Sequence, residues 1–131
     1  MKELSIYNGT AHEITIFATE DTSLSKDGRK LLLKEGAVPI VRIEAGTNLN
    51  CSKKNLEPPT LNTKIPVVGA IVFDGVDPLP SGYDLYVVSN LYRSAYKELV
   101  GDTSKLATIN GAVYQTAQDT RPVGCAGLII G

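Results

Sequence analysis

The segment 83-YDLYVVSNLYRSAYKELV-100 decides the fold, because a strand pattern gives way to a helix pattern inside it. Its first six residues are aromatic, aliphatic and alternating, which predicts a β-strand. Apolar residues then recur every four positions from Leu91, the spacing of one helix face. Ser89 or Asn90 suits the N-cap of this helix, and Gly101 suits its end. The segment therefore predicts a strand that leads directly into a helix.

Other short stretches, alternating or apolar and bounded by Gly, Asn, Asp or Pro, also predict strands. They are residues 3–7, 13–18, 39–44, 65–73, 106–109, 112–118 and 123–130. Asn8-Gly9 and Asn110-Gly111 are strong turn signals, so we expect a β-hairpin around each pair. The most apolar stretch, 65–73, predicts a central strand. The polar stretches 20–29, 47–64 and 74–82 predict loops, of which 47–64 is an extended surface loop.

Consecutive strands in this scheme are mostly joined by hairpins. The sequence therefore predicts an α+β fold, with a mostly antiparallel sheet of about seven strands and one main helix packed on it. A length of 131 residues suits a single domain, 1–131, with one sizeable core.

Composition narrows the function classes. Apolar residues make up 43% of the chain and charged residues 21%, and no apolar run approaches the roughly 18 residues of a membrane span. The net charge of −1 argues against binding to polymeric nucleic acid. We expect no membrane association and, because no signal peptide is visible at the N-terminus, a cytoplasmic location.

Residues for catalysis or metal binding are scarce. His12 is the sole histidine and has no nucleophile motif beside it, so we interpret it as a turn or surface residue. Cys51 and Cys125 are far apart and form no metal-ligand pattern, which predicts two reduced thiols. The three aspartates 74, 77 and 84 could hold a divalent metal, but beside Gly and Pro they also suit turns. We predict no catalytic residues, no metal and no cofactor.

The helix start is the candidate ligand site. Its unpaired backbone amides and the positive end of the helix dipole can hold a phosphate. Arg93 in the first turn can add a bidentate contact. An ordinary capped helix with a surface arginine is the plainer interpretation of the same residues. The ligand-binding residues that we predict are Ser89, Asn90, Arg93, Phe73, Tyr83, Tyr92 and Arg121, with the aromatics as stacking faces and Arg121 as a second phosphate contact.

Four stretches resemble a family of small proteins common in phages and prophages. They are IYNGTAHEITIF (6–17), IPVVGAIVFDGVDPLP (65–80), GYDLYVVSNLYRSAYK (82–97) and RPVGCAGL (121–128). Together they cover just over a third of the chain, in the family's order. The chain departs from the family at residues 8–11, where Asn-Gly-Thr-Ala replaces a Leu-Thr-Pro pattern, so its first turn could differ.

Within that family the chain is similar in length and expected fold to the phage anti-Thoeris sponge proteins. Those proteins bind a cyclic ADP-ribose signal made by bacterial TIR-domain defence enzymes and hold it without cleaving it. The resemblance implies a non-enzymatic binder of a cyclic nucleotide in the host bacterial cytoplasm. It places Asn90 and an aromatic near the Pro-rich loop on the ligand, with basic side chains on the diphosphate.

Sequestration also sets a requirement on assembly. Nanomolar binding needs roughly 12 kcal/mol, which a closed pocket reaches more readily than an open surface. We therefore expect a homodimer or larger homo-oligomer whose interface helps to close the site. Two alternatives remain open at this point: a small phage accessory or structural interaction protein without a small-molecule ligand, and a metal-dependent nucleotide enzyme at the three aspartates.

Overall fold

The computed structural model describes residues 4–58, 60–67 and 69–131. These residues contain one α-helix, α1 (Asn90–Leu99), and one short 3-10 helix, η1 (Thr19–Asp21). Ten strands accompany them: β1 (Ile6–Asn8), β2 (Ile14–Ile16), β3 (Thr22–Leu24), β4 (Leu31–Leu33), β5 (Val41–Ile43), β6 (Cys51–Asn55), β7 (Ile71–Val76), β8 (Leu85–Val87), β9 (Leu106–Tyr114) and β10 (Gly124–Ile130). The predicted α+β class with one main helix is confirmed, although the strands outnumber the seven expected.

The main sheet has eight strands and mixed direction. Its order is β1-β8-β9-β10-β2-β5, with β4 pairing to β9 and β3 to β4. The pairs β1–β8, β8–β9, β4–β9 and β10–β2 are parallel, whereas β9–β10, β2–β5 and β3–β4 are antiparallel. The sheet is therefore mixed and not purely antiparallel, and part of the expected hairpin linkage is replaced by parallel pairs. The helix explains part of this, because α1 connects β8 to β9 and such a crossover makes its two strands parallel.

The first predicted hairpin does not form. β1 pairs with β8, whereas β2 pairs with β10 and β5. The Gly9 amide donates to the Val87 carbonyl at 2.8 Å, and the Gly9 carbonyl accepts from the Leu49 amide at 2.8 Å. Backbone groups that a hairpin would use are thus bonded to distant segments, and the chain crosses from one side of the sheet to the other.

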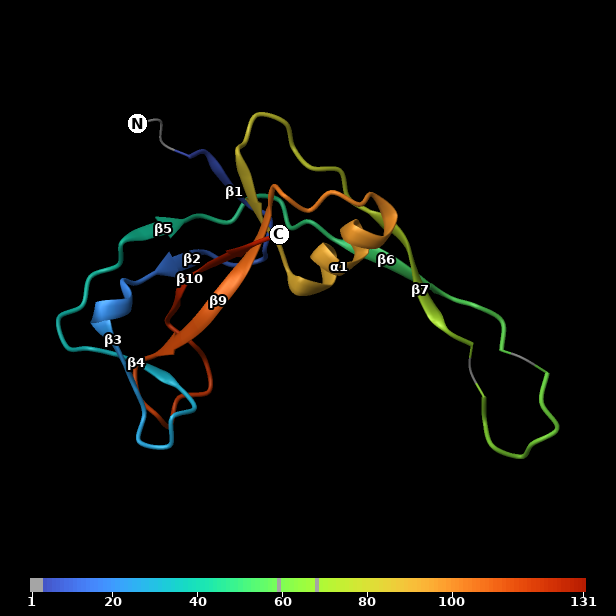
Figure 1. The fold of residues 1–131 in the computed structure, drawn as a ribbon, viewed down its shortest axis with the longest axis horizontal. Coiled ribbons are helices and arrows are strands. Elements are labelled where there is room, and N and C mark those ends of the chain that lie inside the picture. The colour runs from blue at the N-terminus through green and yellow to red at the C-terminus, as the bar shows by residue number, and fades with distance from the viewer. Residues whose placement is uncertain (1–3, 59, 68) are drawn as a thin grey trace.

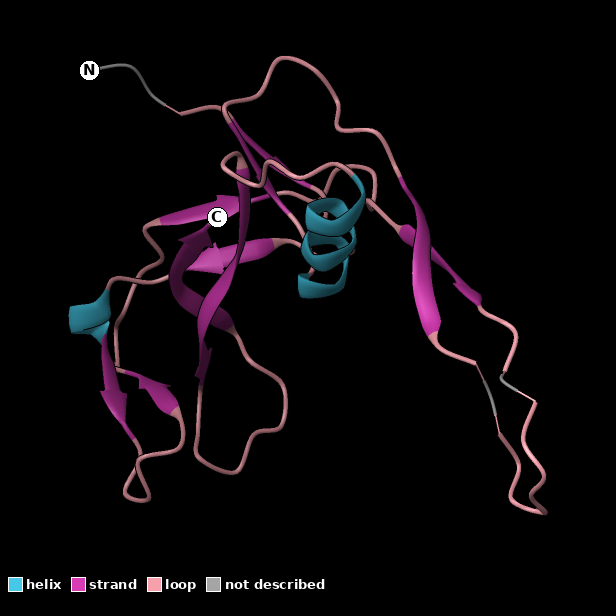
Figure 2. Ribbon diagram, turned by 45° about the vertical axis from the view of Figure 1, so that its right-hand side comes forward, coloured by secondary structure: helices cyan, strands magenta, loops and turns pink. Residues whose placement is uncertain are grey.

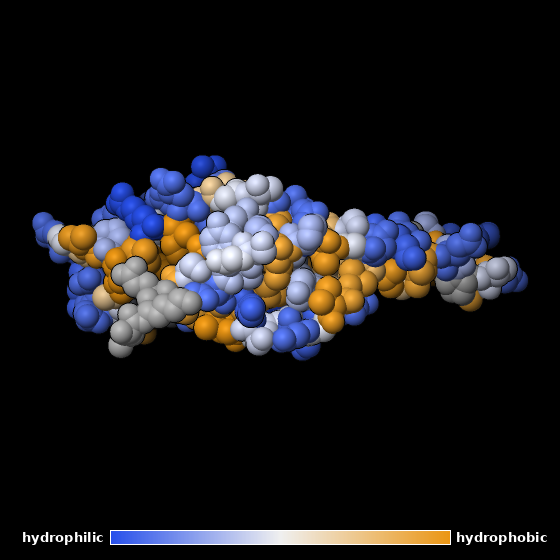
Figure 3. All heavy atoms as spheres, turned by 90° about the horizontal axis from the view of Figure 1, so that it is seen from above, coloured by the Kyte–Doolittle hydropathy of each residue, from blue (hydrophilic) through white to orange (hydrophobic). Residues whose placement is uncertain are grey.

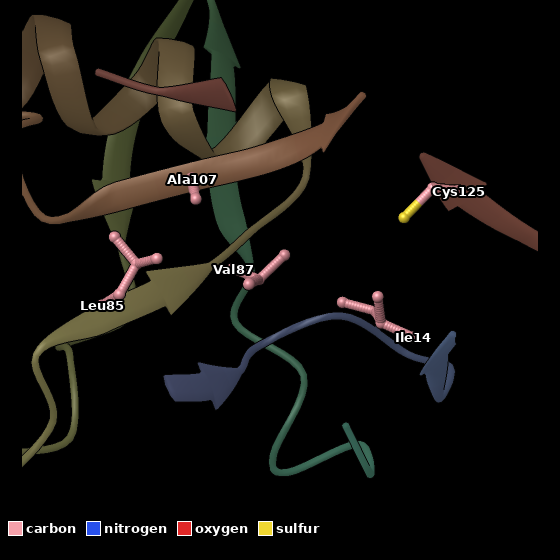
Figure 4. Close-up of a cluster of buried hydrophobic side chains, with 5 residues drawn as sticks. All are labelled: Ile14, Leu85, Val87, Ala107 and Cys125. Carbon is pink, nitrogen blue, oxygen red and sulfur yellow. The ribbon is translucent and has the colours of Figure 1, made fainter. Parts of the chain in front are cut away.

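The sheet curls around a first core. The buried side chains of Ile14, Leu85, Val87, Ala107 and Cys125 come from four strands and point toward one another (Figure 4). β8 and β2 are not neighbours in the sheet, so their contact across this core requires a strongly curved sheet. The outer strands β1 and β5 add Ile6 and Ile43 to the same cluster. The strands β1, β8, β9, β10, β2 and β5 therefore enclose this core, and we call them the half-barrel.

Asn8 closes the half-barrel where β1 approaches β5. This side chain is 2% exposed, and its Nδ2 donates to the carbonyls of His12 at 2.8 Å and Ile43 at 3.0 Å. Its Oδ1 accepts from the amide of Thr10 at 2.9 Å and from the Thr10 hydroxyl at 2.6 Å. The Gly46 amide in turn donates to the Asn8 carbonyl at 2.9 Å. The buried side-chain amide of Asn8 thus connects β1 to the bend at residues 10–12 and to β5.

The second core lies between the sheet and α1, which stands between the main sheet and a separate ribbon of two strands (Figure 2). It consists of Leu49, Tyr86, Val88, Tyr92 and Leu106. The helix begins as predicted, with the Ser89 hydroxyl accepting from the Tyr92 amide at 3.1 Å. It ends as predicted too, because Gly101 has a φ of 113° that favours glycine. None of the helical segments in the described ranges has the length and hydropathy needed to cross a bilayer.

The separate ribbon consists of β6 and β7 and, with the connection between them, projects away from the half-barrel (Figure 1). We call the described residues of this ribbon and its connection, 51–58, 60–67 and 69–76, the arm. It overturns two predictions, since β6 lies inside the expected loop 47–64, and 65–73 is not a central strand. Ile65 is 73% exposed, and Ile71 opens β7 with 64% exposure. The apolar character of this stretch therefore reflects an exposed ribbon and not burial within this chain.

The predicted hairpin at Asn110-Gly111 is also absent. β9 runs unbroken through both residues, and Gly111 has a φ of 69° inside the strand. The first part of β9 pairs with β8 through Leu106 and Ala107, and its last part pairs with β4 through Val113 and Tyr114. Gly111 thus marks the place where β9 changes neighbour, because a glycine accepts the local change of backbone direction. The strand predicted at 123–130 is confirmed as β10.

Candidate ligand-binding site

The helix start is accessible but fully structured. Ser89 and Asn90 are both exposed, and the Ser89 hydroxyl is used to cap the helix. The carbonyl of Asn90 accepts from the Ser94 hydroxyl at 3.0 Å, and the side-chain amide of Asn90 makes no hydrogen bond to any described residue. These two residues lie where the sequence predicts them, at an exposed N-terminus.

Arg93 makes a contact within the chain that the sequence did not predict. Its Nε donates a hydrogen bond to the carbonyl of Gly131, and its side chain is half-buried. The guanidinium therefore fastens α1 to the segment that follows β10. The sequence pattern could not show this contact, because Gly131 is remote in the chain.

The predicted aromatic stacking faces lie apart from one another. Tyr92 is fully buried, and its hydroxyl donates to the Asp77 carbonyl at 2.5 Å. Tyr83 is 37% exposed and packs edge-on against Tyr7, with ring centroids 5.0 Å apart. Phe73 belongs to the arm, where the Lys53 ammonium lies 5.9 Å from its ring centroid. Tyr92 therefore has a structural role, and no cavity found in the described chain joins Tyr83 to Phe73.

Arg121 is the predicted residue that lines a cavity of substantial size. The cavity has a volume of about 620 Å³ and lies between the start of β2, the middle of β9 and the start of β10. Its floor is formed by Ile14 and Cys125, which also belong to the half-barrel core. His12 and Arg121 stand at its polar side. Pockets of this size are typical of small-molecule sites with mostly apolar walls.

His12 and Arg121 line the same cavity, where β2 lies beside β10. Ile16 of β2 is paired with Cys125 of β10, and each of the two polar residues lies four positions before its paired residue. Both residues lie before their strands begin, and both line the cavity. His12 is exposed in a bend, as the sequence interpretation of a turn or surface residue expected, but its place beside this cavity depends on the β2–β10 pairing, which has no local signature.

The electrostatics of this cavity favour an anion over a nucleophilic reaction. Arg121 is exposed and has no hydrogen bond or ion pair to any described residue. Burial raises the pKa of the Cys125 thiol, so the thiol stays protonated at neutral pH and is a poor nucleophile. Glu13 at the rim is the carboxylate among the lining residues. The cavity can therefore accept an anionic group at Arg121 while an apolar part of the same ligand rests on its floor.

The three aspartates accept hydrogen bonds from residues that are distant in the sequence. Asp74 accepts from the Ser52 hydroxyl at 2.6 Å, and Asp77 accepts from the Asn50 amide at 2.8 Å. Asp84 accepts from the Ser5 amide at 3.0 Å. Within the described ranges no three or more His, Cys, Asp or Glu side chains gather at a distance suited to a metal ion. Asp74 lies within β7 and not in a turn, so the turn interpretation does not hold for it, and all three aspartates connect distant segments of the chain.

Gly124 shapes the wall of the cavity, and its replacement should be costly. A Cβ atom there would lie 2.6 Å from the Thr15 carbonyl oxygen and 2.6 Å from the Phe17 ring, so β2 and β10 would have to separate. We expect Gly124→Ala to lower the free energy of unfolding by about 2 kcal/mol, measured by urea denaturation. Gly127→Ala on the same strand is the control, because no atom lies within 4 Å of its Cβ position. Equal stabilities of the two variants would contradict the tight approach.

Comparison with protein-family models, with curated proteins and with solved structures found no match to this chain. The resemblance to the phage anti-Thoeris sponge proteins therefore stays a prediction, and the arrangement around Arg121 is what the chain itself offers for assigning a function.

Proposed function

We propose that the protein is a non-enzymatic binding module that sequesters a cyclic nucleotide signal of the cyclic ADP-ribose type and leaves it intact. The observation that carries the proposal is the unpartnered guanidinium of Arg121 beside an apolar cavity of about 620 Å³. The proposed site is the cavity where β2 lies beside β10, whereas the sequence predicted a site at the helix start. In a host bacterium this activity would be exercised in the cytoplasm.

The chemistry of the two ends of such a ligand suits the two sides of the cavity. A guanidinium forms paired hydrogen bonds to phosphate oxygens, which gives a diphosphate both charge and orientation. The apolar floor at Ile14 and Cys125, with the exposed side chain of Ile109 at its side, can take the flat face of a base. Burial raises the pKa of the Cys125 thiol and makes it a poor nucleophile, which supports capture without cleavage.

The test is a capture-and-release measurement with purified protein and cyclic ADP-ribose. After unbound ligand is removed, the protein is denatured by heat and the released molecule is identified by mass spectrometry. We expect intact ligand in proportion to protein. We expect Arg121→Ala to bind at least tenfold more weakly, because a charge-assisted contact contributes about 1.5–3 kcal/mol.

Arg29→Ala is the matched control for this test. Arg29 is also an exposed arginine, and the hydrogen bond that it makes to Asp27 uses its backbone amide, which alanine retains. Its affinity should equal that of the parent protein. Release of a cleaved product, or equal binding by Arg121→Ala and Arg29→Ala, would contradict the proposal.

The second candidate is a structural interaction protein without a small-molecule ligand, and the projecting arm favours it. Arg93 and Tyr92, which the sequence assigned to a ligand, are engaged in bonds to backbone carbonyls. A thermal-shift screen against a panel of cyclic nucleotides separates the two candidates. A rise in melting temperature with one member of the panel supports the binding module, and a flat response across the panel supports the interaction protein.

A further inference from the structure

The arm exposes a large amount of aliphatic surface for its size. Five of its side chains, each between 36% and 73% exposed, are Leu56, Leu61, Ile65, Val67 and Ile71. Figure 3 shows hydrophobic residues along one side of the arm and hydrophilic residues along the other. Their combined exposed area is on the order of 500 Å², near the upper limit for a patch on a monomeric protein.

The arm is not covered by its own chain. Its root is held by α1, where Tyr92 donates to the Asp77 carbonyl and packs in a cluster with Val76. The Leu56 amide donates to the Ala70 carbonyl at 2.7 Å, and this bond lies within the arm. The described residues between Leu56 and Ala70 make no hydrogen bond to the half-barrel. A two-stranded ribbon with one apolar side is at best marginally stable in water unless that side is packed against something.

The half-barrel carries a second apolar surface that is equally uncovered. β5 is the last strand of the main sheet, and Val38, Ile40 and Val41 on or next to it are 73%, 66% and 41% exposed. An exposed edge strand with aliphatic side chains is a surface that proteins normally protect. The same chain thus presents both an apolar projection and an apolar edge.

We propose that the arm packs against the β5 edge of a second copy of this chain, with the two copies exchanging arms reciprocally. The symmetry argument is that each copy supplies one arm and one edge, so a two-fold pair satisfies both surfaces at once. The area argument agrees. Two arms of about 500 Å² each, with an equal area of the covered edges, bury roughly 2,000 Å², which is the size of a stable interface. This inference concerns an assembly surface and does not depend on the ligand.

The experiment measures oligomeric state by sedimentation velocity over a concentration series. The parent protein should be a dimer at about 10 μM. The double variant Leu61→Asp/Ile65→Asp places two charges on the connecting stretch, away from both cores, and should weaken dimerisation at least a hundredfold. Ile40→Asp at the β5 edge should weaken it at least tenfold.

The control is the double variant Leu4→Asp/Leu24→Asp, whose side chains are 65% and 66% exposed on other parts of the chain. It should sediment as the parent does. Circular dichroism and melting temperature, measured for every variant, show that each one is folded. A parent protein that stays monomeric at 100 μM would overturn the proposal. An undiminished dimer in the Leu61→Asp/Ile65→Asp variant would overturn it as well. An undiminished dimer in Ile40→Asp would overturn the β5 contact.

Discussion

Tyr92→Ala should lower the free energy of unfolding by about 3–5 kcal/mol, the usual cost of removing a buried aromatic side chain. Tyr92 is 0% exposed and lies in the core between α1 and the sheet. Its ring centroid is 6.0 Å from that of Tyr96, and its hydroxyl donates to the Asp77 carbonyl at the root of the arm. The substitution therefore leaves a cavity and an unpaired carbonyl. Because small domains are stable by only about 5–15 kcal/mol, the variant should be marginal.

Urea denaturation followed by circular dichroism measures this loss, and Tyr83→Ala provides the control. Tyr83 belongs to an aromatic cluster with Tyr7 and Tyr86, but it is 37% exposed. Its removal should cost about 1 kcal/mol, because most of the vacated space can fill with water. If the two variants lost the same stability, the assignment of Tyr92 to the second core would fail.

The Tyr92 hydroxyl also predicts a dependence on alkaline pH. Burial raises the pKa of this hydroxyl to about 12, from about 10 in an unfolded chain. The folded state therefore holds the proton more tightly, and this contribution to stability is complete below pH 10 and is lost as the pH rises from 10 to 12. Tyr92→Phe should show a shallower loss of stability over that range than the parent protein.

Asn8→Ala should cost about 3–4 kcal/mol, although it removes only a few atoms. The substitution leaves the carbonyls of His12 and Ile43 and the amide of Thr10 without their partner, in a site that is 2% exposed to water. A buried polar group left unpaired costs about 1–3 kcal/mol. Asn8→Asp should be comparably harmful, because it turns the donor that faces two carbonyl oxygens into an acceptor.

Asn48→Ala is the control for this prediction. Asn48 is exposed, and its side-chain amide makes one long contact of 3.4 Å to Asn50. Its loss should change the free energy of unfolding by less than about 0.5 kcal/mol. A cost below about 1 kcal/mol for Asn8→Ala would show that water replaces the lost hydrogen bonds and that the half-barrel does not depend on this residue.

The elements that the sequence predicts correctly are those with local causes. The α-helix follows from the spacing of Leu91, Ala95 and Leu99 and from the cap at Ser89, which are all within one segment. The strand β10 follows from its run of apolar residues, which comes after a turn-forming stretch. These features act over a few residues, so a single sequence contains all the information that they need.

The pairings that escaped prediction depend on distant residues. Asn8-Gly9 has the composition of a hairpin turn, but the side chain of Asn8 bonds to Thr10, His12 and Ile43 and so directs the chain across the sheet. The apolar run at 65–73 has the composition of a buried strand, but it is exposed in this chain. Composition does not show whether such a strand is buried inside its own chain or against a second molecule. For Asn8-Gly9, a long-range contact overrides a local preference.

The candidate site shows the same division. Exposure of Ser89 and Asn90 follows from their place at a helix start, and the sequence predicts it. The bond between Arg93 and the Gly131 carbonyl, and the place of Arg121 and His12 on one cavity, arise from contacts between distant segments. A single sequence does not show how such residues are grouped, and the ligand-binding residues that it predicts stay predictions.

The parallel pairing of Ile6 in β1 with Leu85 in β8 has a consequence for how the chain is made. During synthesis the first strand leaves the ribosome long before its partner exists, and at the usual pace of translation the delay is on the order of ten seconds. Pairings between distant segments also lower the rate of folding after the chain is released. The newborn chain therefore spends its first seconds with an apolar strand unpaired, a period in which chaperones have the opportunity to bind it.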